Sequence, residues 1–303
     1  MIGMSIVTQR VTGNFARGIS TAAVCAAAIC IALTTSGCEK LKARDHLNQG
    51  VNAFKTGNYS QAADEFHLAI DADPTFGVAR LYLATALEQQ WVPGTETPQN
   101  KKFYDAAMTE FNNVLSNQPT DADRLLATQS LASLYYQAGN NAKGQEQADL
   151  LAKAEDWNKK VLALDPKNKE AYYTLGVIYW DEFLTPDREL RIADGMKLEE
   201  RAPLKPDTKG KTAKADLKAK YYGLLTQGIE DEKKALEIDP NYEEAMDYME
   251  LLTLYRADLD DTKEQYDADV KEANSWMDKA LETKKKNEAK KAAAAEAGGA
   301  VSQ

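Results

Sequence analysis

The sequence predicts an all-α protein built from antiparallel helix pairs. Apolar residues recur at helical spacing along the chain, without the sustained alternation that is typical of strands. Alanine, leucine, glutamate and lysine, which favour helices, dominate a composition that is 44% hydrophobic and 28% charged. Proline recurs after the helical patterns at intervals of 45, 47 and 74 residues. The four prolines are Pro74, Pro119, Pro166 and Pro240.

Residues 43–76 are the clearest helix pair, with the sequence ARDHLNQGVNAFKTGNYSQAADEFHLAIDADPTF. Two small residues let the helices approach closely, and an aromatic residue and an alanine lie on the inner face of the second helix. A proline ends that helix, because it has no backbone N–H to continue it. These residues are Gly50, Ala62, Phe66, Ala69 and Pro74. One pair cannot cover its own apolar face, so further pairs are expected to stack on it.

With Ala43 counted as position 1, these residues occupy positions 8, 20, 24, 27 and 32. This pattern resembles the tetratricopeptide repeat (TPR), a helix–turn–helix unit of about 34 residues. The resemblance implies an α-solenoid, a right-handed superhelix of antiparallel helix pairs. Five units are expected over 43–76, 77–121, 122–168, 169–242 and 243–285. The matching structural residues of the later units are Ala107, Phe111, Pro119, Pro166, Leu175, Gly176, Tyr179, Ala235 and Pro240.

The later units are longer than a simple repeat, so lengthened helices and inserts are expected. In the second unit, Thr97 and Pro98 indicate an N-cap followed by proline in the first helical turn. In the third, Asn158 stands where the repeat usually has an aromatic residue. The fourth contains an insert over 181–220, whose basic part (205–220) we expect to be a solvated, mobile loop. The alternative for this basic part is a surface for an acidic partner or anionic lipid headgroups. The end of the chain, 286–303, is expected to be a polar helix end and a disordered tail.

The first residues, 1–37, are typical of an export signal. Arg10 and Arg17 precede an apolar run over Thr21–Leu33, and small residues follow. The run is alanine-rich and shorter than the ~20 residues that span a membrane. We therefore expect residues 1–37 to act as a removable signal peptide.

The small residues that end in Gly37-Cys38 resemble the lipobox of bacterial lipoproteins, although Thr35 stands where that family usually has leucine. The resemblance implies cleavage before Cys38 and lipidation of its thiol, with 38–42 as a short tether. Glu39, rather than aspartate, implies the outer membrane, facing the periplasm. The alternative is ordinary cleavage after Gly37, which would release a soluble periplasmic protein.

The sequence offers few residues suited to catalysis or to metal binding. The two histidines, His46 and His67, have no cysteine near them in the sequence, and no phosphate-binding loop or nucleophile–base set is evident. The acidic stretch 258–272 has Lys263 where a calcium loop needs glycine, so it predicts a solvated helix start. The net charge of −10 argues against nucleic acid as a partner. We expect no catalysis, metal, cofactor or small-molecule substrate. An enzyme site in 181–220 is the weaker alternative, because that segment has no histidine, cysteine or serine.

The resemblance implies that the first helix of each unit lines a concave groove. The aromatic candidates there are Phe54, Tyr82, Tyr136, Tyr173, Trp180, Tyr248 and Tyr255. Such a groove suits an extended peptide or an apolar helix of a partner protein. The Lys/Asn set with which some TPR proteins bind a terminal carboxylate is absent, since Leu47 and Val51 stand at two of its positions. The sequence thus favours a membrane-anchored scaffold of the cell envelope, with an assembly-factor or pilotin-like role.

Overall fold

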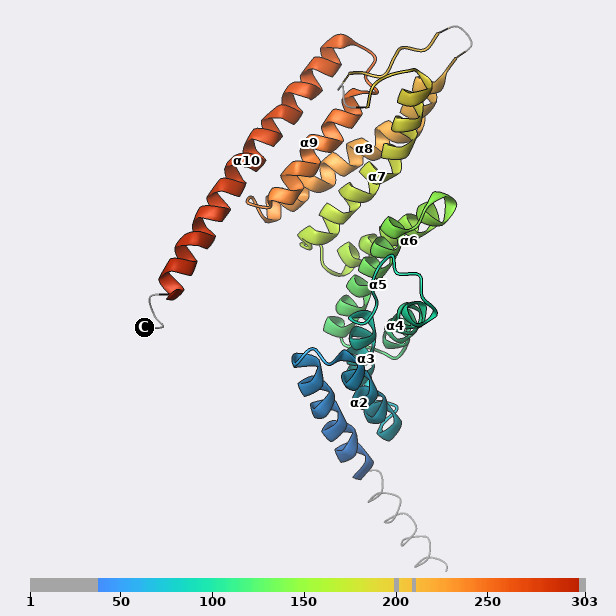
Figure 1. Ribbon diagram of the computed structural model, residues 1–303, viewed down its shortest axis with the longest axis vertical. Coiled ribbons are helices and arrows are strands. Elements are labelled where there is room, and N and C mark those ends of the chain that lie inside the picture. The colour runs from blue at the N-terminus through green and yellow to red at the C-terminus, as the bar shows by residue number, and fades with distance from the viewer. Residues whose placement is uncertain (1–37, 199–201, 209–210, 300–303) are drawn as a thin grey trace, which may run out of the picture. The chain divides into compact units, whose positions relative to one another are not determined.

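The computed structural model describes residues 38–198, 202–208 and 211–299 (Figure 1). Within these residues every regular element is a helix, which confirms the all-α class. A first helix over 38–55 includes the residues that were expected to form a tether. The helices that follow are α2 (Tyr59–Ala72), α3 (Gly77–Glu88), α4 (Pro98–Ser116), α5 (Asp121–Asn141), α6 (Gly144–Leu164), α7 (Lys169–Ala193), α8 (Ala213–Ile238), α9 (Glu243–Ala257) and α10 (Lys263–Gly299).

The chain divides into two compact units. The first comprises Met1–Trp91 and Asp105–Asn117, and the second comprises Val92–Tyr104 and Gln118–Gln303. Helix α4 therefore contributes residues to both units.

Local sequence determines where the second helix of each pair ends. Helices α2, α6 and α8 each end one residue before an aspartate–proline pair. The aspartate side chain accepts a hydrogen bond from the backbone N–H two residues further on, at distances of 3.0–3.1 Å. This turn replaces the helical hydrogen bonds that proline prevents. The three aspartates are Asp73, Asp165 and Asp239.

In the first unit, close packing requires a glycine. A Cβ atom at Gly50 would lie 2.5 Å from Cε1 of Phe66, so any larger residue would displace the ring. Phe66 is fully buried, as are Ala62 and Ala69. His46 contacts Glu65 through Nδ1 at 2.8 Å and so links the first helix to α2.

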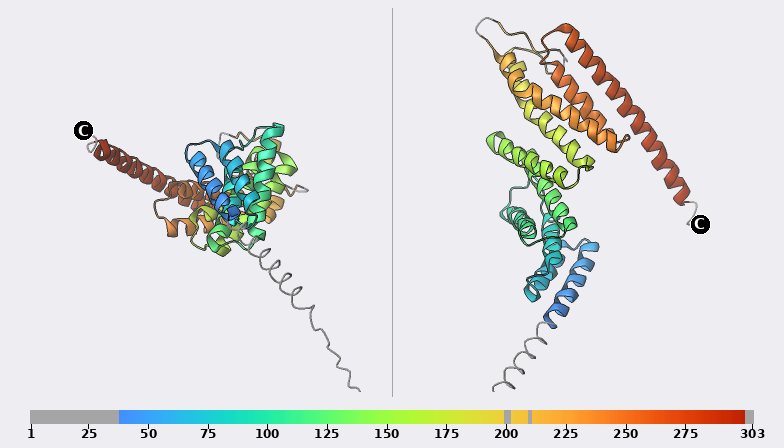
Figure 2. Two further views of the ribbon diagram at one scale, coloured as in Figure 1. Left: turned by 90° about the horizontal axis from the view of Figure 1, so that it is seen from below. Right: turned by 180° about the vertical axis from the view of Figure 1, so that it is seen from behind.

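In the second unit, α7, α8, α9 and α10 form one apolar core. Phe183, Leu225, Met249 and Leu252 are fully buried in it. Helices α9 and α10 lie side by side and antiparallel, and the C-terminal part of α10 continues past the N-terminal end of α9 (Figures 1 and 2). The polar end expected from residue 286 is helical as far as Gly299. The tail, 300–303, lies outside the described residues.

The segment 181–220 is mostly helical. Helix α7 continues through Pro186 to Ala193, and α8 begins at Ala213, so only 194–212 connects them. The prediction of a solvated loop over 205–220 is wrong for its second half, because α8 begins at Ala213. Leu204, just before this basic part, is 1% exposed and packs in the core. Asp207 accepts hydrogen bonds from two backbone N–H groups at the start of α8, both at 2.9 Å.

The acidic turn between α9 and α10 was predicted to be solvated, but two of its aspartates are buried. Asp258 and Asp260 are 0% and 5% exposed, rather than solvated. Asp258 forms an ion pair with Arg191 of α7, and the backbone carbonyl of Asp260 accepts a hydrogen bond from Lys214 of α8 at 2.7 Å. The turn is therefore part of the packing that joins α7, α8 and α9.

The predicted N-cap of α4 is confirmed. Thr97 Oγ1 accepts a hydrogen bond from the backbone N–H of Asn100 at 3.1 Å, and Pro98 is the first helical residue. The Asn100 side chain then bonds the backbone of Val92 and Thr95, each at 2.8 Å. These bonds close the loop before α4.

Candidate functional site

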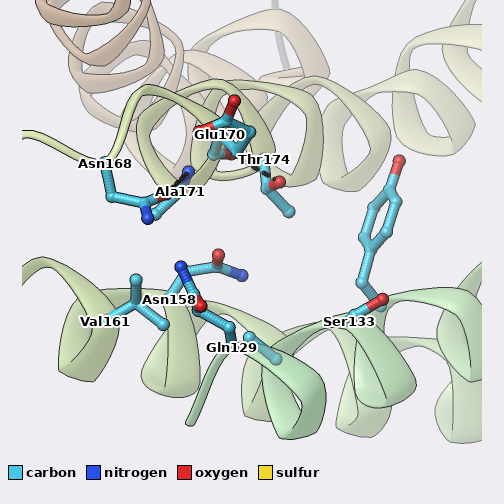
Figure 3. Close-up of a pocket in the computed structure, with 10 residues that line it drawn as sticks. Gln129, Ser133, Asn158, Val161, Asn168, Glu170, Ala171 and Thr174 are labelled. Carbon is cyan, nitrogen blue, oxygen red and sulfur yellow. Dashed lines mark hydrogen bonds between the residues drawn. The ribbon is translucent and has the colours of Figure 1, made fainter. Parts of the chain in front are cut away.

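A pocket of about 290 Å³ lies in the second unit between α5, α6 and α7 (Figure 3). Helices α5 and α7 are the first helices of two consecutive pairs, so the pocket is on the face that the TPR resemblance assigns to binding. Its lining residues are Gln129, Ala132, Ser133, Tyr136, Asn158, Val161, Asn168, Glu170, Ala171 and Thr174.

The pocket is lined by Asn158, a residue smaller than those at the same repeat position in two other helices. In the first unit, Phe66 stands at this repeat position and is fully buried, and Phe111 of α4 is also fully buried. An asparagine is too short to occupy the volume of a phenyl ring, so space remains beside α5. Asn158 is 4% exposed, and its Nδ2 donates to the Ala154 carbonyl at 2.8 Å.

The polar groups of the pocket are held by local hydrogen bonds. Asn168 caps α7, since its Oδ1 accepts from the backbone N–H of Ala171 at 2.9 Å. The Thr174 hydroxyl donates to the Glu170 carbonyl at 2.8 Å, and Ser133 Oγ accepts from Gln137 at 2.7 Å. Figure 3 shows Gln129 and Asn158 on one side of the gap and Glu170 and Thr174 on the other.

This set of side chains matches the chemistry of a peptide backbone. Carboxamides carry both a donor and an acceptor, as a peptide bond does, and hydroxyls can serve as either. The Asn158 Oδ1 has no hydrogen-bond partner among the described residues and is available as an acceptor. An extended chain in the pocket would therefore find partners for its N–H and C=O groups.

One predicted groove residue, Tyr136, lines the pocket, and burial raises the pKa of its hydroxyl. Four others form an adjoining aromatic cluster from α7 and α9. Tyr173 and Trp180 each meet Tyr248 edge to face, with ring centroids 5.4 and 5.6 Å apart, and Trp180 meets Tyr255 at 6.0 Å. All four are half-buried, so they pack on one another while keeping part of their surface exposed.

The remaining two candidates lie in the first unit, against neighbours of that unit. Phe54 packs edge to face on Tyr59 with centroids 5.0 Å apart, and Tyr82 stacks on Phe66 at 5.5 Å. Tyr82 is 40% exposed. Neither residue lines the pocket.

Sequence reasoning missed the polar lining of the pocket. Gln129 of α5 occupies the repeat position at which Tyr173 was selected, and Thr174 of α7 occupies that of Tyr248. Ser133 and Glu170 each lie four residues away, on the same helix faces. The repeat register was the signal that could have found them. Selection of aromatic side chains alone discarded it.

Asp181 of α7 was also missed. It directly follows Trp180, and burial raises the pKa of its carboxyl to about 6. It has no hydrogen bond or ion pair with any residue that the structure describes. Its negative charge also contributes to the raised pKa values of the Tyr136 and Tyr248 hydroxyls.

Across the described residues, no group of histidine, cysteine, aspartate and glutamate side chains is arranged to hold a metal ion. In the same residues no helix is long and apolar enough to cross a membrane. Cys38, the cysteine within the described residues, is free and exposed at the start of the first helix.

Solved structures similar to this chain share its fold at low sequence identity. The MamA RS-1 ArsTM double mutant is 16% identical, with a TM-score of 0.52; the match covers 82% of this chain and 97% of that one. MamA 41-end from Desulfovibrio magneticus RS-1 is 16% identical, with a TM-score of 0.51 and coverages of 81% and 96%. YrrB, described as a TPR protein with an unusual peptide-binding site, is 13% identical, with a TM-score of 0.43 and coverages of 79% and 90%.

The chain matches no protein-family model and no curated protein sequence. The structural likeness at these identities concerns the fold alone. The protein is an all-α helical-repeat protein with the fold of the TPR class.

Proposed function

We propose that this protein is a protein–protein interaction scaffold whose second unit binds an extended segment of a partner protein. The observation that carries the proposal is the pocket between α5, α6 and α7. It is lined by carboxamides and hydroxyls that suit a peptide backbone, and it adjoins the aromatic cluster of Tyr173, Trp180, Tyr248 and Tyr255, which can receive apolar side chains. Backbone bonds would supply affinity, and the cluster would supply selectivity.

Filling the pocket should abolish peptide binding. Ser133 lines the pocket from α5, and Ser133→Phe would place a ring where the peptide backbone is expected. The wild-type protein is expected to enrich a consensus from a phage-displayed library of randomised peptides, whereas Ser133→Phe should not. A synthetic consensus peptide should bind the variant with a Kd at least about tenfold weaker, a loss of about 1.4 kcal/mol. Fluorescence anisotropy measures this difference.

The matched control is Ser275→Phe, which makes the same change at an exposed position of α10. It should bind the consensus peptide as the wild type does. Equal binding by Ser133→Phe and Ser275→Phe would contradict a role for the pocket, and the absence of any consensus from the wild type would contradict peptide binding itself.

We further propose that the protein is anchored in the cell envelope through lipid on Cys38. The signal-like residues 1–37 support this, although they lie outside the described residues. The free and exposed thiol of Cys38 also supports it. A lipid chain contributes ~0.8 kcal/mol of membrane affinity for each buried methylene, and several chains together hold a protein firmly.

Mass spectrometry of the mature N-terminus tests the anchor. A lipidated Cys38 is expected as the first residue, and the protein should sediment with membranes. Cys38→Ser should abolish the modification and leave the protein in the soluble fraction. An unmodified wild-type N-terminus at another residue would overturn the anchor in favour of a soluble periplasmic binding protein.

With the anchor in place, we propose an assembly-factor or pilotin-like role at the outer membrane, facing the periplasm. Such roles need a tethered surface that holds a segment of a client protein. An enzyme site in 181–220 is not proposed. In that segment Arg191 and Asp207 form bonds that hold the connection between α7 and α8.

A further inference from the structure

Asp181 lies on the same strip of α7 as the pocket. Glu170 and Thr174 line the pocket, and Asp181 follows Thr174 by seven residues, about two helical turns along the same face. A peptide that leaves the pocket along α7 would therefore pass the Asp181 carboxylate.

Tyrosine hydroxyls from two other helices lie within electrostatic reach of Asp181. Tyr136 belongs to α5 and also lines the pocket, and Tyr248 belongs to α9; the charge of Asp181 contributes to the raised pKa of both. Trp180, its neighbour in α7, meets Tyr248 with ring planes at 88°. The Trp180 indole Nε1 is buried and has no hydrogen-bond partner among the described residues. Asp181 thus stands at the edge of an aromatic cluster.

The Asp181 carboxylate is half-buried, and no described positive charge is paired with it. Burial is the cause of its raised pKa, and no described lysine or arginine pairs with it. A carboxylate that has lost part of its hydration gains most from a positive charge brought to it, since attraction strengthens as the local dielectric constant falls. The faces of tryptophan and tyrosine rings attract cations as well, and arginine more often than lysine.

We propose that Asp181, with Tyr136, Trp180 and Tyr248, forms a subsite for a basic side chain, arginine or lysine, of the bound peptide. The inference rests on the proposed peptide binding and adds the charge of one peptide residue to it. Charge complementarity selects this occupant: the subsite offers one unpaired carboxylate and aromatic faces, and the chain has a net charge of −10. An acidic or C-terminal carboxylate of a partner would be repelled there.

The randomised peptide library tests the subsite separately from the pocket. Selection on the wild type should enrich arginine or lysine at one fixed position of the consensus. Selection on Asp181→Asn should lose this preference and keep the other consensus positions. The consensus peptide should bind Asp181→Asn about tenfold more weakly than the wild type, and its Arg→Ala version should bind both proteins equally.

Glu189→Gln is the matched control, because it removes one negative charge from an exposed position of the same helix. It should leave the consensus and the Kd unchanged. A second readout is pH: wild-type binding of the basic peptide should weaken below about pH 6, where Asp181 becomes protonated, and Asp181→Asn should lack this step. The hydroxyls of Tyr136 and Tyr248, which lie within electrostatic reach of Asp181 from α5 and α9, have pKa values raised above their ordinary value of 10, so they stay neutral in this range. Glu232 of α8, whose charge also acts on Tyr248, is present in both proteins, so its titration cancels in the comparison.

The possible outcomes separate the two proposals. A consensus without a basic position, or one that keeps it in Asp181→Asn, overturns the subsite and leaves peptide binding intact. No consensus from the wild type overturns peptide binding and the subsite together.

Discussion

Replacing Arg191 with methionine should lower the free energy of unfolding of the second unit by about 3–5 kcal/mol at neutral pH. Arg191 is 4% exposed in α7. Its Nε lies 2.8 Å from Asp187 and its Nη2 lies 2.6 Å from Asp258. Methionine would occupy a similar volume, but it would leave two buried carboxylates without a cation. Removing one member of a buried ion pair is destabilising for this reason.

The guanidinium group joins three segments that are distant in sequence. Asp187 belongs to α7, Asp258 follows α9, and Nη1 donates to the Ala202 carbonyl in the connection before α8 at 2.8 Å. Burial by itself would lower the pKa of Arg191, but the charges and hydrogen bonds of Asp258 and Asp187 outweigh it and raise that pKa. The three N–H donors of a lysine leave from one nitrogen, so they cannot reach all three acceptors as the spread guanidinium does. Arg191→Lys should therefore recover only part of the lost stability.

Urea denaturation followed by circular dichroism measures the effect, with Arg188→Met as the matched control. Arg188 is exposed on the same helix, so its replacement should change the free energy of unfolding by no more than about 0.5 kcal/mol. Limited trypsin digestion should also cut Arg191→Met faster after Lys211, because the connection loses its bond at Ala202. Equal stability of the two variants would contradict the structural role of Arg191.

Replacing Glu232 with methionine should raise the free energy of unfolding by about 1–3 kcal/mol at neutral pH. Glu232 is 0% exposed in α8, and neither carboxyl oxygen has a hydrogen-bond partner among the described residues. A Cβ atom at Gly176 of α7 would lie 2.3 Å from its Oε1, so the carboxyl is pressed against the opposite backbone. In the first unit, Phe66 occupies the same repeat position and is buried against Gly50. An apolar residue of similar length removes the unpaired polar group and keeps the contact.

The stability gained by Glu232→Met should increase as the pH rises. Burial, and then the nearby charge of Asp231, raise the pKa of Glu232 well above its ordinary value of 4.5. Below pH 4.5 the carboxyl is protonated in both the folded and the unfolded chain. As the pH rises from there, the unfolded chain releases its proton first, so the folded state loses relative stability until it too ionises. The advantage of Glu232→Met should therefore be smallest at about pH 4 and larger at pH 8.

At each pH, the difference in the free energy of unfolding between Glu232→Met and the wild type reports on Glu232 alone, because the two proteins share all other acidic residues. Glu237→Met, at an exposed position of the same helix, is the matched control and should show neither the gain nor its pH dependence. If Glu232→Met unfolds at the same or a lower urea concentration than the wild type at pH 8, the unpaired buried carboxyl is not destabilising and the prediction is wrong.

Local rules allowed much of the fold to be predicted. Helical periodicity, the cap at Thr97 and the prolines after α2, α6 and α8 act over a few residues, so they are visible in the sequence. The segment 181–220 shows where such rules stop. Pro186 lies inside α7, and the helix continues past it because Phe183 and Leu190 on either side are buried in the core. Packing compensates there for the hydrogen bond that proline cannot donate.

The candidate site was predicted less completely than the fold. Tyr136 and the aromatic cluster follow from the repeat register, which the sequence carries. The register also places Asp181 on this face, but neither its lack of a partner nor the burial of Glu232 can be read from it. An acidic residue on a helix is solvated in most cases, and only its neighbours make it unusual.

The sequence by itself determined the all-α class and the helix pairs, and it indicated which faces of α5 and α7 line the candidate site. It could do so because helix periodicity and turn chemistry are local. Only the tertiary structure decided that Asn158 lines a pocket, that Arg191 joins three segments, and that Asp181 stands unpaired beside tyrosines of two other helices. The physical reason is that burial and charge compensation depend on residues brought together from distant parts of the chain, and no local pattern records them.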